Sequence, residues 1–100
     1  MNTFDIVIDL LVTADSAADA HTMLADSGAT YGNVTVSLFS RKLWDVEMTS
    51  TIKTETVRTA AATLSDEFRC SLRELDPCWV AHVFYDGAEV LELDAFERGI

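Results

Sequence analysis

Residues 4–13 read FDIVIDLLVT, and this stretch decides the fold. Its side chains form two alternating sets, with Phe4, Ile6, Ile8, Leu10 and Val12 in one, and Asp5, Val7, Asp9, Leu11 and Thr13 in the other. Successive residues of a strand point to opposite faces, so this period of two predicts a strand. One face of that strand is wholly apolar, and the other carries two carboxylates.

The rest of the chain predicts further strands and two helices. We expect a helix over 16–27 that Gly28 ends, a hairpin of strands 33–38 and 44–49, one amphipathic helix over about 54–75, a strand over 78–85 and a last strand over 89–94. The Asp86-Gly87 pair between the last two strands is a strong signal for a two-residue hairpin turn.

This order of elements is the split βαβ arrangement of ferredoxin-like folds, with one extra strand at the C-terminal end. We therefore predict a single α+β domain over residues 1–100, in which two helices cover one face of an antiparallel sheet. In that topology the first and fourth strands are neighbours. The acidic ends of the chain would then lie close together.

The charge of the chain is large and unevenly placed. Seventeen Asp and Glu against seven Lys and Arg give a net charge of −10, while 49% of the residues are hydrophobic. The hydrophobic content excludes a disordered acidic tail. The charge disfavours direct binding of nucleic acid or of an anionic membrane, and it favours a basic protein as the partner.

The sheet face opposite the helices is predicted to be partly apolar, which indicates an interface, including a homodimer through this open face. A regular hairpin around Asp86-Gly87 puts Val80, His82 and Phe84 with Leu91 and Leu93 on one face, and Trp79, Ala81, Val83 and Tyr85 with Val90 and Glu92 on the other. A register shift of one residue would exchange these two faces.

The two histidines, His21 and His82, are the candidates for a ligand pocket, because a core-facing His82 could lie under the helices near His21. Their spacing matches no metal motif, so we predict no metal and no cofactor. Cys70 and Cys78 also match no zinc or redox motif and are predicted to be reduced thiols. With no signal peptide or membrane span in the sequence, we expect a cytoplasmic protein.

These features favour a small protein-binding module over an enzyme. The hypothesis is an inhibitor or immunity-type protein that engages a basic, nucleic-acid-binding partner protein. The predicted contact residues are the acids Asp5, Asp9, Glu89, Glu92 and Asp94, with Trp79 and Tyr85 as aromatic anchors. Two alternatives stay open. The chain could be a dimeric small-molecule-binding or small enzyme domain with a pocket at the sheet face, or an acidic domain without a specific binding role.

Overall fold

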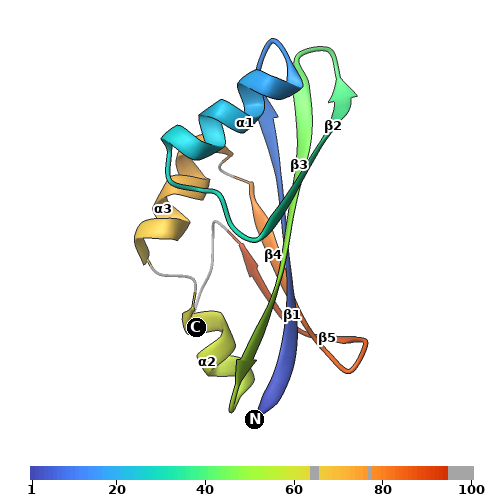
Figure 1. Ribbon diagram of the computed structural model, residues 1–100, viewed down its shortest axis with the longest axis vertical. Helices are drawn as coiled ribbons and strands as arrows, with labels where there is room; N and C mark the ends of the chain where they lie inside the picture. The colour runs from blue at the N-terminus through green and yellow to red at the C-terminus, as the bar shows by residue number, and fades with distance from the viewer. Residues whose placement is uncertain (64–65, 77, 95–100) are drawn as a thin grey trace.

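The computed structural model describes residues 1–63, 66–76 and 78–94 (Figure 1). It is an α+β structure with one five-stranded antiparallel sheet and three helices. The elements are β1 (Asn2–Thr13), α1 (Ala17–Asp26), β2 (Asn33–Ser40), β3 (Leu43–Thr54), α2 (Val57–Ala62), α3 (Asp66–Leu75), β4 (Val80–Tyr85) and β5 (Ala88–Asp94).

The strands lie in the order β2-β3-β1-β4-β5, so β1 is the central strand. It pairs with β3 from Asn2↔Thr54 to Thr13↔Leu43, and with β4 from Phe4↔Tyr85 to Asp9↔Val80. The predicted contact between the first and fourth strands is thus confirmed. The order differs from that of a simple ferredoxin fold, because β5 extends the sheet beyond β4.

The core lies between the sheet and the helices, which Figure 1 shows together on one side of the sheet. The predicted apolar face of β1 forms its centre, with Ile6, Ile8 and Val12 fully buried. Leu24 of α1 and Leu72 of α3 pack into the same cluster. The strand that decided the fold in the sequence therefore supplies the middle of the core.

The single helix predicted over about 54–75 is wrong, because two helices, α2 and α3, occupy this part of the chain. Thr56 caps α2, and its side chain and that of Thr59 each accept a hydrogen bond from the other residue's backbone N–H. At the other end, the Thr63 hydroxyl donates to the backbone oxygen of Thr59. Threonine hydroxyls that bond to nearby backbone groups favour helix ends over helix interiors. An apolar stripe with helical spacing carries no such information about ends.

An aspartate side chain binds the backbone of β1 just before β4 begins. The last pair between the two strands is Asp9↔Val80, and the backbone N–H of Leu11, further along β1, donates to Asp76 Oδ2 at 2.8 Å. The other oxygen of this carboxylate accepts from the Cys78 backbone N–H at 2.9 Å. Asp76 thereby joins the end of α3 to the central strand.

Gly32 brings the loop after α1 directly against β3. Its φ is +63°, and a Cβ at this position would lie 2.1 Å from the Thr49 carbonyl oxygen. Gly28 has a similar φ of +70°, but a Cβ there would meet nothing within 4 Å. The two glycines therefore separate the effect of backbone conformation from the effect of close packing.

We expect Gly28→Ala to lower the free energy of unfolding by about 1–2 kcal/mol, the ordinary cost of a left-handed alanine. Gly32→Ala should add a further ~1–3 kcal/mol, because the new methyl group overlaps β3. Urea denaturation of the two variants measures the difference. Equal losses in both would show that the loop does not approach β3 as described.

Candidate functional site

The face of the sheet opposite the helices, called the open face below, collects the acidic side chains of three strands. Six carboxylates lie on it: Asp5 and Asp9 of β1, Asp45 and Glu47 of β3, and Glu89 and Glu92 of β5. No element among the described residues covers this face. Asp5 and Asp9 are thus on the face that the alternation in β1 predicts.

The two acids of β3 lie on the open face because of the register of this strand with β1. Asp9 lies opposite Glu47, and Leu11 lies opposite Asp45. Directly paired residues of antiparallel strands share a face. The alternation of Asp45 and Glu47 with the apolar residues of β3 was visible in the sequence, but only the pairing with β1 puts these acids beside Asp9.

The surroundings of Asp9 change the ionisation of its carboxyl. Partial burial raises the pKa of its carboxyl above the ordinary value of 3.8, and repulsion from Asp45 raises the pKa further. His82 acts in the opposite direction and lowers this pKa. The net direction is upward because burial is the largest of the three effects.

The presence of both β5 glutamates on the open face depends on a β-bulge. Val83 pairs with Leu91, whereas the next residue, Phe84, pairs with Glu89, so that Val90 is an extra residue in β5. Residues three apart in a regular strand point to opposite faces. The extra residue brings Glu89 to the same face as Glu92, as a bulge re-aims side chains elsewhere in sheets.

Both glutamates converge on His82. Its Nδ1 lies 2.5 Å from Glu89 Oε1 and 3.6 Å from Glu92 Oε2. The His82 side chain is 25% exposed, and those of Glu89 and Glu92 are 43% and 54% exposed. The group is therefore accessible from solvent, with the imidazole as its least exposed member.

The bulge also corrects the predicted faces of the last hairpin. His82 and Phe84 lie on the open face, while Ala81 and Val83 point into the core with Leu93. Beyond the bulge, the observed register of β4 and β5 differs by one residue from that of the regular hairpin predicted from Asp86-Gly87. The turn itself is as predicted, with φ of +53° and +80° at these two residues.

Apolar side chains separate the acids of the open face. Val7 and Leu11 of β1 and Phe84 of β4 are each partly exposed there. The rings of Phe84 and His82 lie 6.2 Å apart. The face thus combines a partly apolar centre with carboxylates on both sides.

The two predicted aromatic anchors do not lie on this face. Trp79 is 1% exposed and belongs to the core, which corrects the expectation that it is a surface anchor. Tyr85 is 41% exposed, but its ring packs against Phe4 and its hydroxyl donates to Asn2 Oδ1 at 3.2 Å. It therefore lies at the end of β4, on the helix side of the sheet. Phe84 is an aromatic side chain that does lie on the open face, where Trp79 and Tyr85 do not.

The remaining predicted residues are placed apart from one another. His21 is exposed on α1, whereas His82 lies on the open face, so the structure does not bring the two histidines into one pocket. Asp94 is the last residue of β5, and its side chain lies outside the described part of the structure. Cys70 and Cys78 are both exposed and free.

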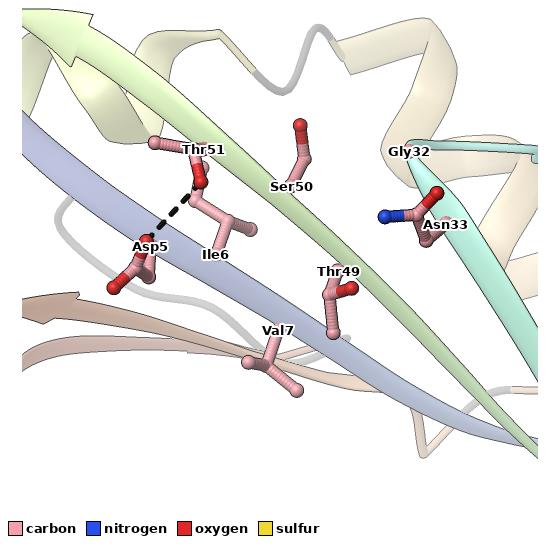
Figure 2. A pocket seen from close by; sticks show the side chains of 8 residues that line it. All are labelled: Asp5, Ile6, Val7, Gly32, Asn33, Thr49, Ser50 and Thr51. Atoms are coloured by element: carbon pink, nitrogen blue, oxygen red, sulfur yellow. Dashed lines mark hydrogen bonds between the residues drawn. The ribbon is translucent and has the colours of Figure 1, made fainter.

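An open hollow of about 480 Å³ lies where β2 begins beside β3 (Figure 2). Its lining includes Asp5, Asn33, Thr49 and Thr51, and the Thr51 hydroxyl donates to Asp5 Oδ1 at 3.2 Å. Figure 2 shows Val7 and Thr49 pointing to one side of the sheet, away from Ser50. Neither His82 nor Tyr85, the residues expected to line a pocket, belongs to this hollow.

Comparisons of the chain with protein-family models, curated proteins and solved structures find no match. Among the described residues, no helix has the length and apolar character needed to cross a membrane.

The raised pKa of Asp9 predicts a pH-dependent gain in stability for Asp9→Asn. The folded state binds this proton more tightly than the unfolded chain, so ionised Asp9 destabilises the fold above its folded pKa. We expect the variant to melt at a higher temperature than the wild type at pH 7. The advantage should shrink as the pH falls through the folded pKa of Asp9, and it should vanish below 3.8.

Melting curves by circular dichroism from pH 3 to pH 8 measure this difference. Asp5→Asn, which removes the same charge from an exposed position of the same strand, is the matched control and should change the melting temperature little. An Asp9→Asn variant that is less stable than the wild type at pH 7 would contradict the described surroundings of Asp9.

Proposed function

We propose that the chain is a protein-binding module whose open face docks on a basic surface of a partner protein. The observation that supports this most directly is the gathering of six carboxylates on one face of the sheet. An inhibitor or immunity-type protein of a nucleic-acid-binding protein is the class that this surface fits. Carboxylates in such a surface take the place of phosphates in a cationic groove.

The distribution of cations strengthens the argument. Of the described Lys and Arg residues, Arg58, Arg69 and Arg73 belong to α2 and α3, and Arg41 and Lys42 form the turn between β2 and β3. Lys53 lies on the open face, but near the end of β3, where it pairs with Thr3. The acids of the open face are thus largely uncompensated, which accelerates encounter with a basic partner.

Partly exposed Val7, Leu11 and Phe84 add apolar contact area between the charges. Binding energy at interfaces is concentrated in a few central side chains from which water is excluded, with aromatic residues among the most frequent. Phe84 is the aromatic side chain that we place in this role. A second copy of the chain fits the face less well than a basic protein, because two such faces would bring twelve carboxylates together.

We infer that the fold is ferredoxin-like, with β5 as an addition. The order β2-β3-β1-β4 inside the larger sheet and the helices on one side support this description. The fold by itself implies no function. We also place the chain in the cytoplasm, because two exposed, unpaired cysteines suit a reducing compartment.

Binding of a small polar molecule is a second candidate function, favoured by the hollow beside Asn33 and Thr49. Its volume of about 480 Å³ lies within the range typical of ligand sites. A screen of metabolites by thermal shift tests this function. A ligand present at 100 times its dissociation constant should stabilise the fold by about 2.7 kcal/mol.

The test of the proposed protein-binding function is reversal of charge on the open face. Asp5→Lys/Glu47→Lys changes two exposed carboxylates of this face and leaves the acids of β5 intact. Like charges brought together across an interface cost several kcal/mol, so we expect affinity for the partner to fall at least about tenfold. The partner is first captured on the immobilised chain from a native lysate at low salt, identified, and purified for binding measurements.

Asp26→Lys/Glu74→Lys is the matched control, because it makes the same change in net charge at exposed positions of α1 and α3. It should bind the purified partner nearly as well as the wild type. Binding of the wild type should also weaken as salt rises from about 50 mM to about 300 mM. Equal losses in the two double variants would mean that net charge, and not the open face, determines binding.

A further inference from the structure

His82, Glu89 and Glu92 form a compact group of three potential metal ligands on the open face. One nitrogen or oxygen atom from each residue lies within 4.8 Å of those from the other two. His82 comes from β4 and both glutamates come from β5, so paired strands of the sheet hold all three. We propose that this group binds a divalent transition-metal ion of the Zn²⁺ class.

The β-bulge is the feature that creates the group. Glu92 lies directly opposite His82, as the register of the two strands requires. Glu89 lies opposite Phe84, on the face of His82, as a regular hairpin also places it, whereas Glu92 reaches the position opposite His82 only because Val90 is an extra residue in β5. Bulges are over-represented next to functional sites, where they re-aim a side chain. Here the bulge turns one additional carboxylate toward a histidine that already faces another.

The distances suit a small ion between the three side chains. Ligands at about 2.0–2.2 Å from a tetrahedral Zn²⁺ are separated from one another by about 3.3–3.6 Å. The imidazole Nδ1 lies 3.6 Å from Glu92 Oε2 and 2.5 Å from Glu89 Oε1. The Glu89 side chain is 43% exposed, so a rotation of this side chain can open the shorter distance without moving the backbone.

The ligand types select the kind of metal. An imidazole nitrogen with two carboxylates suits Zn²⁺ and its neighbours Co²⁺, Ni²⁺ and Cu²⁺. Ca²⁺ takes six to eight oxygen ligands, and Mg²⁺ retains most of its water, so neither gains from the imidazole. Three protein ligands also leave a fourth position open to water.

The surrounding charge favours a cation at this position. Asp9 pairs with Val80, two residues from His82 along β4, and adds a further carboxylate to the same face. The proposal does not depend on whether the open face binds a protein, because Asp5, Asp45 and Glu47 take no part in it.

Isothermal titration of the untagged chain of 100 residues with ZnCl₂ tests the proposal. The exposed thiols of Cys70 and Cys78 also bind Zn²⁺, so every variant is made in a Cys70→Ser/Cys78→Ser background. We expect one Zn²⁺ per chain in this background. CaCl₂ and MgCl₂ should bind at least about tenfold more weakly, because they lack affinity for the imidazole nitrogen.

Variants of the three ligands assign the site. His82→Gln, Glu89→Gln and Glu92→Gln should each weaken Zn²⁺ binding at least about tenfold, since even the loss of a group that only orients a ligand costs 10- to 100-fold. His21→Gln is the matched control, because it removes the other histidine of the chain from an exposed position on α1. Glu47→Gln removes a carboxylate of the same face from outside the group. Both controls should bind Zn²⁺ as the background does.

Each alternative outcome would overturn the proposal. Zn²⁺ binding that survives in His82→Gln would show that the imidazole is not a ligand. Ca²⁺ binding as tight as Zn²⁺ binding would show that the acidic face attracts cations in general. A loss of Zn²⁺ affinity in Glu47→Gln equal to that in the three ligand variants would show the same. Circular dichroism of each variant confirms that a loss of binding does not come from unfolding.

Discussion

The central position of β1 is the constraint on which the rest of the structure depends. With β3 on one edge and β4 on the other, its backbone is fixed, and each of its side chains must face either the core or the open face. Alternate residues of β1, from Phe4 to Val12, face the core, which leaves Asp5 and Asp9 on the opposite side with Val7 and Leu11. Cross-strand pairing then adds Asp45 and Glu47 beside them. The separation of charge from the core is thus a direct consequence of strand geometry.

A single additional residue in β5 produces the second feature of the open face. Without Val90 as an extra residue, Glu89 and Glu92 would lie on different faces of the sheet, while His82 would stay on the open face because it pairs with Val7 of β1. The bulge adds Glu92 to the face that already holds His82, Phe84 and Glu89. The features that support protein binding and metal binding therefore share one local irregularity. On the core side of the same hairpin, the bulge also brings Leu93 opposite Ala81.

Much of the fold could be predicted from the sequence, because the alternation in β1 and the Asp86-Gly87 turn are local signals. The positions of Asp5 and Asp9 on one face followed from the same alternation. The bulge could not be predicted, because Val90 is as apolar as Leu91 and either residue could face the core. This one shift gave Trp79 and His82 the wrong surroundings. The start of α2 at Val57 and its separation from α3 were also missed, since hydrophobic spacing does not report the capping hydrogen bonds of Thr56 and Thr59.

The register of the β4-β5 hairpin is the most direct test of this account, because the open face depends on it. Cross-strand nuclear Overhauser effects between backbone protons of ¹³C,¹⁵N-labelled protein measure the register in solution. The structure requires Val83 opposite Leu91 and His82 opposite Glu92. Val83 opposite Val90 and His82 opposite Leu91, the register of a regular hairpin, would contradict the account, because His82 and both glutamates would no longer share a face.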